Sequence, residues 1–234
     1  MNHSSFAQDE EPIISFEEAV RQFDQGLYEI VLPEITRARK DSPWDDQWWM
    51  LEIRTHLRLG QYGEADGAID EALERRAYSI SLNLLDYQMS DARGRESAKR
   101  DRLDDLRYFF NSWVQRAQSA IELVHLGEIA LVLGVEPRVV LENFFKPARD
   151  LEETTPEAFL ATARIAQEKG DFAFASRVLQ EGLTKFPGNP DLLSSIARSF
   201  LTGDRQEMIR FAELALDGNS RHVETRVLLA DHAI

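Results

Sequence analysis

The amino-acid sequence predicts an all-α protein built from repeated helical hairpins, and three observations support this fold class. The 234 residues include only 12 glycines and 8 prolines, fewer than an average globular chain carries. No segment shows the sustained alternation of apolar and polar residues that a half-buried strand requires. Gly26, Gly60 and Gly94 are spaced by 34 residues, and Gly170 and Gly203 by 33 residues, which is the period of a helix–turn–helix repeat.

Capping residues mark where the helices begin. Ser15 followed by Glu18 has the pattern of a capping box, and Ser42, Thr155 and Asn189 each precede a proline suited to the first helical turn. The sequence predicts helices over residues 15–25, 28–40, 43–59, 62–76, 79–91, 95–111, 119–133, 137–149, 156–169, 172–186, 190–202, 205–217 and 220–233.

The residues around the periodic glycines agree in phase. Eleven residues before Gly60 and Gly170 there is an aromatic residue, two residues after them there is another, and five residues after them there is an alanine. These residues are Trp49, Tyr62 and Ala65 in one unit, and Phe159, Phe172 and Ala175 in the other. Glycine permits the tight interhelical turn, and small residues let two helices approach closely, so we expect both aromatics before the glycines and both alanines to be buried.

These residues resemble the tetratricopeptide repeat (TPR). The resemblance is clearest at Trp49–Arg75 and Pro156–Pro190, fair at Ser15–Pro43 and Pro190–Asp217, and degenerate at Leu123–Ala148, where the second helix is irregular. It implies a right-handed α-α superhelical solenoid of helical hairpins. We expect an N-terminal block over residues 13–117 and a C-terminal block over residues 118–234 that ends in an unfinished repeat.

Three segments fit the repeat less well. Residues 1–12 are polar and acidic and are expected to be disordered, or else Ser5–Ala7 before Gln8 is the remnant of a removed export signal, so cytoplasmic and exported locations both stay open. Residues 91–107 carry mixed charges and form either a solvated helix face or a mobile insertion between the blocks. The last helix, residues 221–234, is either a cap or the first helix of a further repeat.

The charge and the residue usage exclude several classes of function. The chain carries 41 acidic and 27 basic residues, a formal net charge of −14, which disfavours nucleic acids and anionic membranes as main partners. With no cysteine, the sequence allows no disulfide, cysteine-ligated zinc, iron–sulfur cluster or thiol catalysis. The five histidines have no close metal-ligand spacing, and the paired carboxylates are typical of solvated helix faces. We therefore predict no catalytic residues, no metal, no cofactor and no enzymatic activity.

The TPR resemblance implies that the first helices line a concave groove. Matching groove positions hold Arg54, Arg164 and Arg198, and Leu160, Gln167, Ser194 and Leu201 occupy neighbouring ones. Repeated arginines on one face of an acidic protein suit bidentate binding of acidic side chains or a C-terminal carboxylate of a protein partner. The alternative is that each arginine pairs with a groove carboxylate such as Glu128 or Glu157.

Three functions compete at this point. The leading hypothesis is a non-catalytic scaffold that binds a peptide or a domain in the groove. The segments 125–145 and 222–234 are also similar, more loosely, to the N-terminal TPR region of large bacterial proteins that carry a metallopeptidase-like domain further on, so the chain could be the repeat region of a larger enzyme. RNA binding by a related helical-hairpin repeat is disfavoured by the acidic charge.

Overall fold

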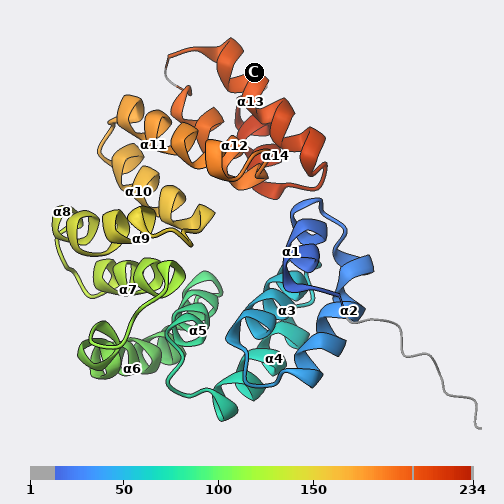
Figure 1. The fold of residues 1–234 in the computed structure, drawn as a ribbon, viewed down its shortest axis with the longest axis vertical. Helices are drawn as coiled ribbons and strands as arrows, with labels where there is room; N and C mark the ends of the chain where they lie inside the picture. The colour runs from blue at the N-terminus through green and yellow to red at the C-terminus, as the bar shows by residue number, and fades with distance from the viewer. Residues whose placement is uncertain (1–13, 202, 233–234) are drawn as a thin grey trace, which may run out of the picture.

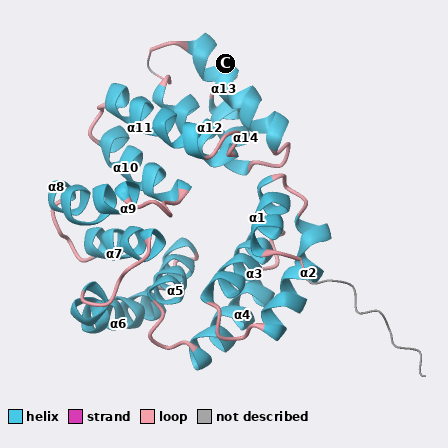
Figure 2. Cartoon of the chain, in the orientation of Figure 1, coloured by secondary structure: helices cyan, strands magenta, loops and turns pink. Residues whose placement is uncertain are grey.

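The structure, a computed structural model, describes residues 14–201 and 203–232 and consists of consecutive antiparallel helices. The helices are α1 Phe16–Asp24, α2 Tyr28–Asp41, α3 Asp46–Arg58, α4 Tyr62–Arg75, α5 Ile80–Ala92, α6 Glu96–Val114, α7 Ala120–Val132, α8 Pro137–Val140, α9 Lys146–Asp150, α10 Pro156–Glu168, α11 Phe172–Lys185, α12 Pro190–Ser199, α13 Arg205–Gly218 and α14 Val223–Asp231. These ranges contain no strand, as Figure 2 shows, which confirms the predicted all-α class. The N-terminal segment 1–12, expected to be disordered, lies outside the described residues.

The predicted helix over residues 137–149 is interrupted. A short π-helix, η1 Leu141–Phe145, joins α8 to α9. Pro147 follows two residues later and lacks the backbone N–H that a regular α-helical turn would use, so a widened turn avoids its clash with the preceding backbone. This irregular second helix is the one in which the repeat pattern was degenerate.

The hairpins follow one another around a ring (Figure 1), which brings the first and last hairpins side by side. The first helices of the hairpins, α1, α3, α5, α7, α10 and α12, contribute side chains to the central cavity described below. In the described part of the chain, no helix has the length and apolar character needed to cross a membrane.

The turn glycines have the predicted role. Gly26, Gly60, Gly94, Gly134 and Gly170 all have positive φ values between 63° and 86°, a conformation that side-chain-bearing residues rarely adopt. Each of them lies in the turn between the two helices of a hairpin.

The aromatic residues before these turns are buried inside their own hairpins. Trp49 and Phe159 are fully buried, as are Ala65 and Ala175, so the predicted phase of the repeat is confirmed. A methyl group added at Gly182 would lie 2.9 Å from the ring of Phe159. A small residue on the second helix therefore makes room for the aromatic side chain of the first helix.

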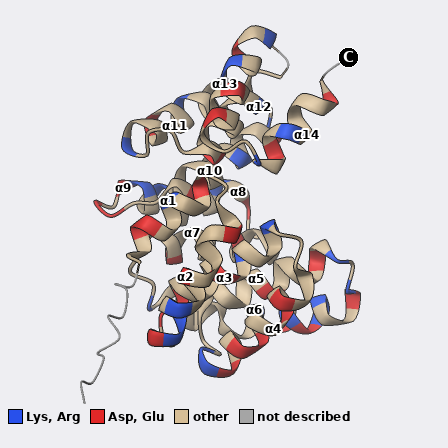
Figure 3. Ribbon diagram, turned by 90° about the vertical axis from the view of Figure 1, so that its right-hand side faces the viewer, with Lys and Arg blue, Asp and Glu red and all other residues tan. Residues whose placement is uncertain are grey.

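The charged segment in the middle of the chain is a regular part of the solenoid. It forms most of α6, and ion pairs join Lys99 to Asp91 and Arg102 to Asp86. Acidic and basic residues are interspersed on the face that carries α4 and α6 (Figure 3). Trp113 at the end of α6 is buried in an apolar cluster that also takes in residues of α5 and α7. The structure thus favours a solvated helix face over a mobile insertion.

The close packing around Gly127 predicts that alanine substitutions at two helical glycines have opposite effects on stability. At Gly127 an added methyl would lie 2.2 Å from the ring of Phe145, so Gly127→Ala should lower the free energy of unfolding by about 1–3 kcal/mol. Gly67 in α4 has open space around it, and Gly67→Ala should raise the same free energy by up to about 1 kcal/mol. Urea unfolding followed by circular dichroism measures both, and equal effects would contradict the packing described.

Candidate functional site

The first helices surround a central cavity of about 1560 Å³. Met50, Leu57 and Leu160 give its wall apolar surface, while Arg54 and Glu157 face the same space and form an ion pair with a nitrogen–oxygen distance of 3.7 Å. The wall thus combines apolar contact area with a few placed polar groups, as ligand-binding cavities do.

The predicted groove residues divide into two groups. Arg54 and Leu160 line the cavity, whereas the other five do not: Arg164, Gln167, Ser194, Arg198 and Leu201. Only the N-terminal parts of α10 and α12 reach the cavity, through residues such as Leu160 and Asp191. Arg164 and Arg198 therefore lie outside this cavity, and the expectation that they face one shared groove stays a prediction. A matching position in two helices does not fix which turn reaches the centre of the ring.

The residues outside the cavity have other contacts. Arg164 is exposed and pairs with Glu128, which was the alternative to ligand binding that the sequence left open. Gln167 donates hydrogen bonds to the backbone oxygen of Ser195 and to the hydroxyl of Ser199, both at 2.9 Å. Ser194 is buried, and Leu201 packs against the apolar core of the C-terminal hairpins.

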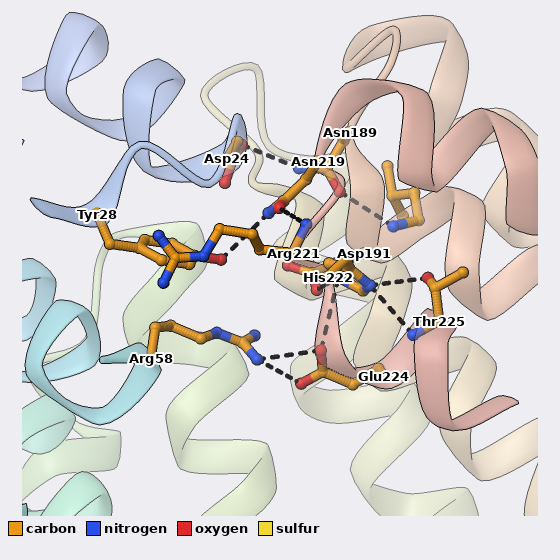
Figure 4. Close-up of polar contacts among 11 residues, drawn as sticks. Asp24, Tyr28, Arg58, Asn189, Asp191, Asn219, Arg221, His222, Glu224 and Thr225 are labelled. Carbon is orange, nitrogen blue, oxygen red and sulfur yellow. Dashed lines mark hydrogen bonds and ion pairs between the residues drawn. The ribbon is translucent and has the colours of Figure 1, made fainter. Parts of the chain in front are cut away.

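A polar contact closes the ring, and we call it the clasp (Figure 4). Its members are Asp24, Tyr28, Glu29 and Arg58 from the N-terminal hairpins, and Asn189, Asn219, Arg221 and Glu224 from the C-terminal ones. The Asn219 amide donates to the Tyr28 hydroxyl at 3.1 Å in a buried position. On the exposed side, Arg221 pairs with Glu29 at 2.5 Å and Arg58 pairs with Glu224 at 2.8 Å.

Gly26 permits this close approach. It has a φ of +78°, and a methyl group added there would lie 2.4 Å from the Asn219 side-chain oxygen. The same glycine therefore serves the turn between α1 and α2 and the contact with the far end of the chain. Sequence reasoning identified the first role and missed the second, because the partners are separated by more than 190 residues.

His222 supports the C-terminal side of the clasp. The side chain is buried, with Nε2 2.8 Å from an Asp191 oxygen and Nδ1 2.8 Å from the Thr225 hydroxyl. Asp191, His222 and Glu224 place three ligand atoms within 4.8 Å of one another, the spacing of a metal site. However, the cationic Arg58 already binds Glu224, and Nδ1 accepts the backbone N–H of Thr225, so these side chains fit a hydrogen-bonded support for α14.

Asp24 carries an unusual charge state in the clasp. Burial raises its pKa to about 7, and the nearby carboxylates of Asp191 and Glu157 add to the shift. Its partner is the Asn189 amide at 3.4 Å. Closing the ring thus favours the protonated form of this carboxyl.

His125, which also lines the cavity, is held neutral. Burial lowers its pKa to about 3, with a smaller contribution from Arg54, and its Nδ1 lies 2.7 Å from the Ser81 hydroxyl. A histidine with so low a pKa is a weak general base at neutral pH. The serine–histidine pair therefore gives no support to hydrolytic catalysis.

Comparison with solved structures places the chain among helical repeat proteins. The Cut9–Hcn1 hetero-tetramer of the APC/C is 12% identical, with a TM-score of 0.52, over 92% of this chain and 41% of that one. A TPR protein from Parabacteroides merdae is 15% identical over 93% of this chain and 85% of its own, with a TM-score of 0.49. YrrB, a TPR protein with an unusual peptide-binding site, is 15% identical over 83% and 96%, with a TM-score of 0.42.

The chain spans less than half the length of the Cut9–Hcn1 chain that it matches. No protein-family model and no curated protein matches the sequence. At these identities the likeness is one of fold.

The clasp predicts a change in ring closure when its buried hydrogen bond is removed. Tyr28→Phe leaves the Asn219 amide without its partner and should lower the free energy of unfolding by about 1–3 kcal/mol. Because the chain has no cysteine, spin labels at Ile30→Cys and Asp217→Cys can report the distance across the clasp, and its distribution should broaden. Tyr62→Phe, at an exposed tyrosine that is not a member of the clasp, is the control and should change neither quantity. An unchanged distance distribution in Tyr28→Phe would contradict the role of this bond.

The raised pKa of Asp24 predicts that closure of the ring weakens as pH rises. Its folded pKa lies above its ordinary value, so its stabilising contribution is complete below pH 4 and is lost as pH rises through about 7. The groups facing it are Asp191 of α12, Glu157 of α10, Arg54 of α3 and His222, which precedes α14. Asp24→Asn keeps a neutral side chain at every pH, so at pH 8 the variant should be more closed than the wild type in the same label measurement.

The label distance is measured against pH in the wild type and in Asp24→Asn. The difference between the two curves reports Asp24 alone, because His222 is present in both proteins. Glu168→Gln, on the exposed surface of α10, serves as the control for loss of one negative charge. Superimposable profiles for the wild type and Asp24→Asn would show that this carboxyl does not govern closure.

Proposed function

Because the chain is a TPR-like helical repeat protein, we propose that it is a non-catalytic scaffold that binds a peptide, or an extended segment of a protein partner, in its central cavity. The observation that carries the proposal is the convergence of six first helices on one cavity with a mixed apolar and polar wall. Its volume of about 1560 Å³ exceeds the roughly 300–1,000 Å³ of small-molecule sites, which suits a segment of several residues.

The wall favours an amphipathic segment that carries a carboxylate. Met50 and Leu160 offer contact to apolar side chains, as anchors in a buried interface do. The ion pair of Arg54 with Glu157 is long, at 3.7 Å, so the guanidinium can exchange this partner for an acidic side chain or a C-terminal carboxylate of the ligand. Arg164 and Arg198, outside the cavity wall, enter the proposal only as outlying contacts on α10 and α12.

A selection of random peptides tests the function. A peptide displayed from a random library and selected on the full chain should bind with an affinity that Leu160→Glu lowers about tenfold or more, since a buried charge replaces an apolar contact. Val139→Glu changes an exposed valine of α8 that does not line the cavity, and it should leave the affinity unchanged. Isothermal titration calorimetry measures both affinities, and circular dichroism checks that both variants are folded. Equal affinities for the two variants would refute binding in the cavity.

A further inference from the structure

We propose that the cavity rim around Arg116 is the anchoring subsite of this scaffold, and that it takes an aromatic side chain next to a carboxylate in the partner. We call the rim formed by Tyr78, Tyr108, Phe109, Ser112 and Arg116 the aromatic rim. The proposal rests on the proposed function, because it identifies where the partner is recognised and by what chemistry.

Arg116 differs from every other arginine of the cavity wall. Four of the five pair with carboxylates: Arg54 with Glu157, Arg58 with Glu224, Arg75 with Glu71 and Arg76 with Asp46. Within the described residues Arg116 forms no ion pair, and its guanidinium donates to the backbone oxygen and the hydroxyl of Ser112 at 3.1 and 3.0 Å. These neutral acceptors orient the guanidinium and leave its charge unbalanced, although the chain as a whole carries −14.

The rim beside Arg116 is aromatic and open. Tyr78 is 64% exposed and Tyr108 is 80% exposed, which is unusual for side chains of this size. Phe109 lies between them, with its ring centre 5.3 Å from that of Tyr78 and 4.9 Å from that of Tyr108, both in edge-to-face geometry. The three rings and Arg116 enclose a shallow pocket of about 490 Å³. A pocket of this volume has room for one aromatic side chain of a ligand.

The aromatic rim is continuous with the central cavity. Tyr78 and Arg116 line both spaces, so a segment held in the cavity can place its next residue on the rim. The backbone of Tyr78 is fixed by a hydrogen bond from the Trp113 indole at 2.9 Å, and Trp113 itself is fully buried. The subsite is therefore attached to the rigid core, so little ordering is needed when a ligand binds.

Charge complementarity selects the occupant. The unbalanced guanidinium would repel a basic ligand, whereas an acidic group can form a charge-assisted, bidentate contact with it. Because the chain carries a net charge of −14, the unbalanced guanidinium is a favoured position for this carboxylate and sets the position of the segment along the rim. A neighbouring aromatic side chain then fills the space between the two tyrosines.

Small aromatic probes of opposite charge test the subsite directly. We expect indole-3-acetate, titrated in the millimolar range, to shift the backbone amide resonances of Tyr78, Tyr108 and Arg116 in ¹H–¹⁵N spectra. Tryptamine, which has the same ring and a positive charge, should bind at least about tenfold more weakly, as expected when a charged hydrogen bond is lost.

Two arginine variants make the test specific. Arg116→Gln should weaken indole-3-acetate about tenfold or more and abolish the preference over tryptamine. Arg177→Gln removes an exposed arginine of α11 that lines neither space and should leave both titrations unchanged. Equal binding of the two probes to the wild type, or no effect of Arg116→Gln, would overturn the proposal.

The library-selected peptide separates this proposal from the proposed function. If the peptide loses affinity in both Leu160→Glu and Arg116→Gln, cavity and rim act together. If only Leu160→Glu weakens it, the cavity binds the partner and the rim assignment is wrong. If neither variant weakens it, both proposals are wrong and the partner binds elsewhere on the solenoid.

Discussion

The fold depends on a steric constraint that three of its hairpins share: a large aromatic side chain of one helix must fit against a small residue of the other. Phe159 lies against Gly182, and Phe145 lies against Gly127 with the two helices exchanging these roles. The fully buried Trp49 shares its apolar cluster with Ala72 in the same way. This interlocking sets the distance between the helices of these hairpins, and the succession of hairpins brings α14 back to α1 around the cavity.

The contacts that join neighbouring hairpins differ in kind from those that close the ring. Apolar clusters run through consecutive hairpins, but in the described residues no such cluster contains members of both α1–α2 and α12–α14. The ends meet through hydrogen bonds and ion pairs, and the ion pairs of Arg221 and Arg58 are partly exposed. Exposed pairs contribute little to stability, so the clasp is far weaker than the solenoid that it closes. Opening at this point would leave every hairpin intact.

Much of the fold could be predicted from the sequence because its signals are local. The glycine period, the caps at Ser15 and Asn189 and the aromatic–alanine phase predicted helices and buried faces that the structure confirms. The cap predicted at Ser42 is wrong, because α3 begins later with Asp45 as its N-cap, and the Thr155 side chain makes no capping hydrogen bond. Two of the groove positions that the TPR resemblance implied, Arg54 and Leu160, line the cavity. The clasp could not be predicted, since no pattern in one sequence connects Tyr28 to Asn219. The curvature of the ring, which excludes Arg198 from the cavity wall, is a sum of small angles that no single residue reports.

If the proposed partner segment crosses the ring, closure separates the affinity of binding from the rate of release. Such a segment can leave a closed ring in two ways. It slides along the cavity until its free end has passed through, or the clasp opens. A short peptide with a free terminus is released at a rate set by its contacts with the wall. A segment flanked by folded domains cannot slide out, because the domains are too large to pass through the cavity. Its release then requires the hydrogen bond between Tyr28 and Asn219 to break.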